Sequence, residues 1–225
     1  MEAVDVSIYS DEVELAKTVA LDTLTLINSK LRESAKCHVA LTGGSLGNQI
    51  AENLAKELNK GNWDGLNIWW SDERYVHFES ELRNDLIFMK SIDEKCGIEV
   101  HRTPHEGDLE KSALHFNREL SKVDFDLIIL GVGPDGHVAS LFPGQLDVNE
   151  ARDAFAIKNS PKPPSERITF SMRKINSAKE IWLVASGIAK ADVVAELVEG
   201  ESKLPVGQVS LTRLIVDSLA FGVGE

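Results

Sequence analysis

Residues 125–144 read FDLIILGVGPDGHVASLFPG, and this stretch decides the fold. Its apolar run, residues 127–130, is bounded by glycine, which is the pattern of a β-strand buried on both faces. A glycine- and proline-rich break follows, and it carries Asp135 and His137. Open α/β sheets bind their ligands at the carboxyl ends of their strands, and histidine ionises near neutral pH. The stretch therefore predicts both a central strand and a candidate site.

Strand-like and helix-like patterns alternate on both sides of this stretch. Strands are expected at 4–8, 37–41, 66–70, 98–101, 154–157, 167–170, 180–185 and 214–216. Helices are expected at 11–31, through 50–58, and at 85–92, 109–120 and 188–199, the first of them capped by Ser10. This alternation predicts an α/β fold with a mostly parallel sheet and helices on both faces. With no internal repeat or low-complexity linker, we expect one domain over residues 1–225.

Composition excludes several classes of partner. The net charge of −12 over 225 residues argues against nucleic acid and anionic membrane, because both require a basic surface. Cys37 and Cys96 are too few for a disulfide framework or a zinc site, and we expect reduced cytoplasmic thiols. The acidic N-terminus has no long apolar run, so no signal peptide is expected. No stretch approaches the roughly 20 apolar residues of a membrane span.

Two motifs match familiar patterns in a misleading way. Residues 131–136, GVGPDG, fit G-x-G-x-x-G, but Pro143 and Gly144 end any helix too soon for a dinucleotide site. Residues 43–47, GGSLG, fit the nucleophile elbow of α/β-hydrolases, with His137 downstream. Only two predicted strands precede this elbow, which disfavours a Ser45 nucleophile. No histidine shows metal-ligand spacing, and we expect packing or surface roles for the others: His38, His77, His101, His105 and His115.

A phosphate clamp is the better interpretation of the TGGS turn. Backbone N–H groups of a glycine-rich turn at a helix N-terminus bind anions, and the Ser45 hydroxyl adds a donor. Lys190 is placed in the first turn of its helix, where a cation opposes the helix dipole unless an anion is bound. Two arginines also lie where loops meet strands: Arg74 is expected to end the strand at 66–70, and Arg167 begins the strand at 167–170. Each feature alone also fits an ordinary turn or a surface ion pair.

The motifs TGGS, SDERYV, LGVGPDGHVASLFPG, PPSERITF and SGIAKA occur in the order found in 6-phosphogluconolactonases, and this resemblance covers nearly the whole chain. It implies the sugar-phosphate isomerase-like (Rossmann-like) fold that glucosamine-6-phosphate deaminases share. It also implies hydrolysis of 6-phospho-glucono-1,5-lactone in the oxidative pentose phosphate pathway, without a metal or an organic cofactor. The expected partner is a small phosphorylated sugar lactone, bound by a cytoplasmic monomer or weak homo-oligomer.

Residue roles follow from the matching motifs. The resemblance implies that His137 is the general base, that Asp135 shapes its loop and that Arg74 is an active-site cation. The implied phosphate cradle comprises Thr42, Gly43, Gly44, Ser45, Arg167 and Lys190. The chain departs from the family pattern at TGGSLG, where SGGSTP is common, at Arg83, where serine is common, and at His77, where proline is common. These departures affect the expected shape of the pocket more than its chemistry.

Two alternatives remain at this point. Deaminases of the group typically carry a glutamate that assists sugar ring opening at the position of Phe142, so Phe142 favours the lactonase. A non-catalytic sugar-phosphate sensor is the other alternative, and the presence of His137 beside the phosphate clamp argues against it.

Overall fold

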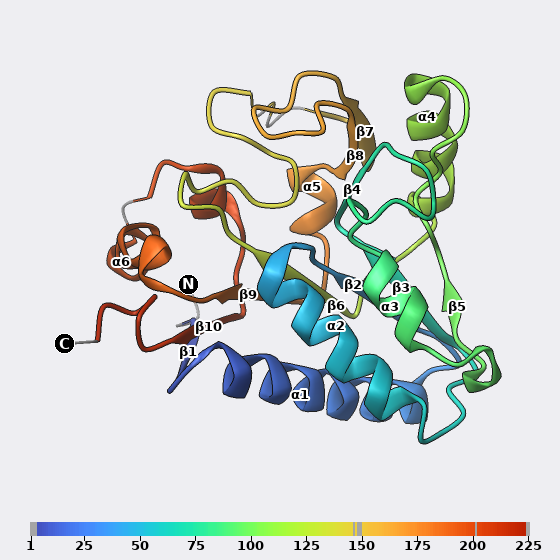
Figure 1. Cartoon of the computed structure of the whole chain (residues 1–225), viewed down its shortest axis with the longest axis horizontal. Helices are drawn as coiled ribbons and strands as arrows, with labels where there is room; N and C mark the ends of the chain where they lie inside the picture. The colour runs from blue at the N-terminus through green and yellow to red at the C-terminus, as the bar shows by residue number, and fades with distance from the viewer. Residues whose placement is uncertain (1–3, 146, 148–149, 201, 224–225) are drawn as a thin grey trace.

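A computed structural model describes residues 4–145, 147, 150–200 and 202–223 (Figure 1). Within them, the main sheet has seven strands in the order β1-β10-β9-β6-β2-β3-β5, and every neighbouring pair is parallel. The strands are β1 (Asp5–Tyr9), β2 (Cys37–Leu41), β3 (Leu66–Trp70), β5 (Glu99–Val100), β6 (Leu127–Gly131), β9 (Glu180–Ala185) and β10 (Arg213–Asp217). The apolar run 127–130 is fully buried in central β6, which confirms its prediction.

A second, antiparallel sheet was not expected. Its strands are β4 (Asp72–Arg74), β8 (Arg167–Phe170) and β7 (Ala154–Ile157). The chain leaves the main sheet at Ser71, whose N–H donates to Leu41 and whose carbonyl accepts from Phe170. The prediction that Arg74 ends β3 is therefore wrong. Arg74 lies opposite Arg167 in the second sheet. Arg74 and Arg167 are consequently neighbours on adjacent strands of the second sheet.

Helices cover both faces of the main sheet, as predicted. On one face, α1 (Glu12–Glu33), α2 (Gly44–Leu58) and α3 (Leu86–Ser91) bury apolar side chains against the strands, and α1 and α2 lie side by side (Figure 1). On the other face lie α4 (Leu109–Leu120), α5 (Met172–Ile175), α6 (Ala191–Glu199) and the second sheet. Short 3-10 turns occur at η1 (Glu94–Cys96), η2 (Ile188–Lys190) and η3 (Pro205–Gln208). Two separate apolar cores result.

Several predicted boundaries need correction. The cap of α1 is Asp11 and not Ser10, because the Asp11 carboxylate accepts from the backbone N–H groups of Val13 and Glu14, both at 2.9 Å. The predicted helix 188–199 begins as the 3-10 turn η2 and becomes α-helical only at Ala191. The short elements β4 and α5 were missed. Among the described helices, none is both long and apolar enough to cross a membrane.

Candidate active site

A cavity of about 200 Å³ lies where the carboxyl ends of β2 and β6 meet the second sheet. It is lined by Thr42, Gly43, Gly44, Asp72, Arg74, Asn84, Gly131, Val132, Gly133, Pro134, His137, Ala139, Lys162, Arg167 and Lys190. The predicted site residues are brought together here, apart from Asp135 and Ser45, which stand just outside the lining. Segments distant in the sequence thus converge as the parallel topology requires.

The loop after β6 shapes the position of His137. The N–H of Gly133 donates to the carbonyl of His137, and the N–H of Gly136 donates to the carbonyl of Gly133, both at 2.9 Å. A Cβ on Gly133 would lie 1.9 Å from His137 Nδ1, so only glycine permits this close approach. Gly136 adopts φ +75°, which glycine favours. The glycines of GVGPDG therefore build a tight turn around His137 and not a dinucleotide site.

One ring nitrogen of His137 contacts both members of an ion pair, Asp135 and Lys162, whose Oδ1 and Nζ lie 3.3 Å apart. Its Nδ1 is 2.6 Å from Asp135 Oδ1 and 3.2 Å from Lys162 Nζ, and its ring packs against Phe142 with centroids 4.8 Å apart. Burial lowers the pKa of His137 below its ordinary 6.5, and the charge of Lys162 adds to this, although Asp135 opposes it. Burial would raise the pKa of Asp135, yet His137 and Lys162 lower it to about 2. His137 is consequently neutral at neutral pH, as a general base requires.

Arg167 is more heavily engaged than the sequence suggests. Its guanidinium donates from Nη2 to the Lys162 carbonyl at 3.0 Å and from Nε to the Pro164 carbonyl at 3.2 Å. Its Nη1 lies 3.4 Å from Ser140 Oγ and 3.7 Å from Asp72 Oδ2. Arg167 therefore holds the loop that carries Lys162 while it also lines the cavity.

The TGGS turn, residues 42–45, lies against two other segments that line the cavity: the end of β6 and the segment that carries Asn84. Thr42 Oγ1 accepts from the Gly131 N–H at 3.0 Å, which joins the ends of β2 and β6. A Cβ on Gly43 would lie 1.8 Å from Asn84 Oδ1, so glycine is needed there too. Ser45 differs from expectation, because its hydroxyl donates to Glu12 Oε1 at 3.1 Å. Ser45 lines an adjoining hollow of about 260 Å³, which shares Gly44 and Lys190 with the cavity.

Lys190 lies where the sequence predicted, at the N-terminal end of a helix. It ends the η2 turn and is the cap residue of α6. Burial lowers the pKa of Lys190, the charge of Lys162 acts in the same direction, and Asp135 opposes both. A bound anion would relieve the cost of a half-buried cation at a helix N-terminus.

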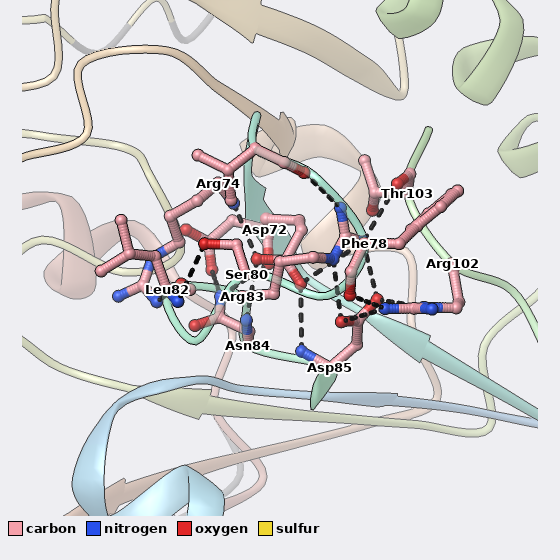
Figure 2. Close-up of polar contacts among 12 residues, drawn as sticks. Asp72, Arg74, Phe78, Ser80, Leu82, Arg83, Asn84, Asp85, Arg102 and Thr103 are labelled. Carbon is pink, nitrogen blue, oxygen red and sulfur yellow. Dashed lines mark hydrogen bonds and ion pairs between the residues drawn. The ribbon is translucent and has the colours of Figure 1, made fainter. Parts of the chain in front are cut away.

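Three lining residues with polar or charged side chains are absent from the predicted site: Asp72, Asn84 and Lys162. Asp72 accepts from the Ser140 hydroxyl at 2.5 Å. The Asn84 amide donates to the Asp72 carbonyl at 2.9 Å, and both residues are labelled in Figure 2. Lys162 belongs to the proline cluster, interpreted from the sequence as a rigid surface loop. Asp72 and Asn84 were visible inside quoted motifs, whereas no sequence signal pointed to Lys162. No metal-binding group of His, Cys, Asp or Glu side chains occurs within the described residues.

Comparison with known proteins gives consistent matches. The family model for glucosamine-6-phosphate isomerases/6-phosphogluconolactonase matches residues 10–216. A protein of Mycobacterium leprae named 6-phosphogluconolactonase is 33% identical over 212 residues, which cover 87% of this chain and 86% of that protein. An Arabidopsis thaliana protein named 6-phosphogluconolactonase 3, chloroplastic, is 34% identical, with 91% and 70% covered. The crystal structure of a 6-phosphogluconolactonase from Thermotoga maritima matches with a TM-score of 0.83 at 26% identity, with 96% and 99% covered.

Proposed function

This chain belongs to the glucosamine-6-phosphate isomerase/6-phosphogluconolactonase family, and from this premise we propose that it hydrolyses 6-phospho-glucono-1,5-lactone to 6-phosphogluconate. The observation that carries the proposal is the cluster of His137, Asp135 and Lys162 at the edge of a cation-lined cavity. A neutral imidazole oriented by a carboxylate suits proton abstraction from water, and cations suit a phosphorylated substrate.

His137 acts as the general base in this proposal. Its Nδ1–H donates to Asp135, which leaves Nε2 to take a proton from water as the water oxygen bonds to the lactone carbonyl carbon. Arg74 stabilises the negative charge that develops on the carbonyl oxygen. The bond from that carbon to the ring oxygen then breaks, and protonated His137 returns the proton to the departing oxygen.

Phosphate binding is assigned to the other end of the cavity. Gly43 and Gly44 open α2, a helix of 15 residues whose first N–H groups are free to donate to an anion. Thr42 and Lys190 complete the cradle, and Ser45 joins it when its hydroxyl turns from Glu12 to the phosphate. Arg167 supplies charge while it holds the Lys162 loop. Such binding away from the reacting carbon orients the lactone.

The residues next to His137 favour lactone hydrolysis over deamination. Phe142 is fully buried and packs on the His137 ring, so an apolar side chain stands where the deaminases typically carry a glutamate. Because both sheets contribute to the cavity, we propose that residues 1–225 act as one domain on a small phosphorylated lactone.

Assay of freshly prepared 6-phospho-glucono-1,5-lactone, corrected for spontaneous hydrolysis, tests this proposal. Ammonia release from glucosamine 6-phosphate is measured in parallel. We expect enzymatic lactone hydrolysis and no deamination. A rate equal to the spontaneous one, with or without deamination, would overturn the proposal.

A further inference from the structure

A cluster of buried charges lies beside the cavity wall that carries Arg74 and Asn84 (Figure 2). Arg83 donates from Nε and Nη2 to the Asp85 carboxylate at 2.9 and 2.6 Å. Arg102 donates to the same carboxylate at 2.8 and 3.0 Å. The side chains of Arg83 and Asp85 are 0% and 1% exposed. Two guanidinium groups on one buried carboxylate leave excess positive charge, which a second carboxylate must offset.

The second carboxylate is Glu73, whose side chain is 1% exposed and whose Oε2 lies 3.7 Å from Arg83 Nη2. Its Oε1 accepts from the backbone N–H groups of Arg74 and Asn84, both at 2.8 Å. Its Oε2 accepts from the backbone N–H of Asp85 at 3.0 Å. One buried carboxylate therefore ties β4 to the start of α3 and closes the loop between them.

Both ends of that closed loop reach the cavity. Arg74 donates from Nη1 to the Leu82 carbonyl at 2.5 Å, and the Asn84 amide donates to the Asp72 carbonyl at 2.9 Å. The Arg74 Nε and the Asn84 Oδ1 are buried and find no hydrogen-bond partner among the described residues. Buried polar atoms of this kind are costly unless a ligand or water completes them. Sugar hydroxyl and carbonyl groups are suited to do so.

We propose that Glu73 is a positioning residue, whose ionised carboxylate holds Arg74 and Asn84 in the orientation that meets the substrate. The carboxylate form accepts all of these backbone bonds on two charged oxygens, whereas protonation removes the charge that strengthens them and turns one acceptor site into an O–H donor. The inference rests on the proposed function in one respect, namely that the substrate of this cavity is the phosphorylated lactone.

The charges around Glu73 determine when this arrangement holds. Arg83 and, from the paired strand β8, Arg167 attract the carboxylate, while Asp85 repels it. Burial raises the pKa of Glu73 to about 7; Asp85 adds to this, and Arg83 and the backbone donors oppose it. The carboxylate is therefore present above about pH 7 and is lost as the pH falls through that value.

The decisive experiment compares the pH dependence of kcat/KM in wild type and Glu73→Gln, with Glu81→Gln as the matched control. Glu81 is exposed in the same loop. On the acid side of the wild-type profile, we expect kcat/KM to fall with one midpoint near pH 7, and Glu73→Gln to lack this midpoint. At high pH, kcat/KM of Glu73→Gln should be roughly 10- to 100-fold lower than that of wild type. Glu81→Gln should match wild type. A Glu73→Gln profile with the wild-type midpoint and rate would overturn the proposal.

A second measurement needs neither the variant nor activity. In NMR spectra of the wild-type protein, the backbone amides of Arg74, Asn84 and Asp85 should shift together, with a midpoint near 7. Amides that do not shift across this range would overturn the proposal, even if Glu73→Gln does not fold. An absence of lactonase activity in wild type would overturn only the proposed function, since the NMR titration does not depend on turnover.

Discussion

The Nδ1 atom of His137 lies 2.6 Å from Oδ1 of Asp135, and this bond assigns separate tasks to the two ring nitrogens. Asp135 is two residues away along the same tight turn, so the orientation is built into the loop after β6. The pKa of Asp135 is lowered to about 2, which keeps it a carboxylate at every pH of interest. In the proposed mechanism, Nδ1 donates to Asp135 and Nε2 is thereby left for proton transfer with water.

Replacement of His137 by alanine should remove general-base catalysis. We expect kcat/KM to fall by about 10²–10⁴-fold, while the affinity for 6-phosphogluconate stays within a few-fold. Steady-state kinetics and calorimetric titration measure the two quantities. His115→Ala, at an exposed position on α4, is the control and should leave both unchanged. Near-wild-type turnover in His137→Ala would rule this residue out as the base.

Gly133→Ala tests whether the turn itself holds His137. The added Cβ would meet His137 Nδ1 at 1.9 Å and Asp135 Oδ1 at 2.3 Å, so the pair must separate. We expect a folded protein with at least about 10²-fold lower kcat, because a displacement near 1 Å has that effect on catalysis. Circular dichroism reports the fold. Full activity in this variant would contradict the close approach described for the loop.

Lys162→Gln should move the pKa of His137 upward. The Lys162 ammonium, 3.2 Å from Nδ1, lowers that pKa, so its removal favours the imidazolium. The base form exists above the pKa, and we expect its loss to begin at a higher pH than in wild type. NMR titration of the His137 ring measures the change directly, with Lys158→Gln, an exposed lysine, as the control. A pKa that stays constant or falls would contradict the electrostatic role of Lys162.

Most of the main sheet could be predicted from the sequence because burial leaves a clear pattern. Strands buried on both faces, such as β6 and β9, are continuous apolar runs, and α4 shows helical spacing with an aspartate cap. Strands β7 and β8 were predicted with the observed bounds, but their pairing into a second sheet was missed, because β4 has only three residues, DER, all of them charged. Asp72 and Glu73 are buried because Ser140 and Arg83 contact their carboxylates. No hydrophobic pattern within β4 itself predicts this burial.

The site was predictable where chemistry and local backbone coincide. His137 and Asp135 stand within one glycine-rich turn, so a short sequence window contains both. Lys162 lies in the proline loop directly before β8, and Arg167, the first residue of β8, holds that loop through the carbonyls of Lys162 and Pro164. The contacts of Lys162 with Asp135 and His137 join residues 27 and 25 positions apart, and no motif spacing in the sequence marks them. The orientation of Ser45 toward Glu12 likewise depends on the packing of α1 against α2.

Ser45→Ala should leave a working enzyme. The Ser45 hydroxyl donates to the Glu12 carboxylate and not to His137, so it is not paired with a histidine base. The single O–H can donate to a phosphate only after it leaves Glu12, so its loss should raise KM by no more than roughly 2- to 10-fold with little change in kcat. A fluorophosphonate probe should not label this residue. Stoichiometric labelling, combined with inactivity of the variant, would establish a nucleophilic serine instead.

Lys190→Ala separates phosphate binding from chemistry. Lys190 lines both the cavity and the hollow that contains Ser45, and it caps α6, where its charge is favourable only with an anion nearby. A charged hydrogen bond is worth about 1.5–3 kcal/mol, so KM for the phosphorylated lactone should rise roughly 10- to 100-fold. Unphosphorylated gluconolactone should lose far less, because it never uses that charge. Exposed Lys203, changed to alanine, is the control. Equal losses on both lactones would show that Lys190 does not bind the phosphate.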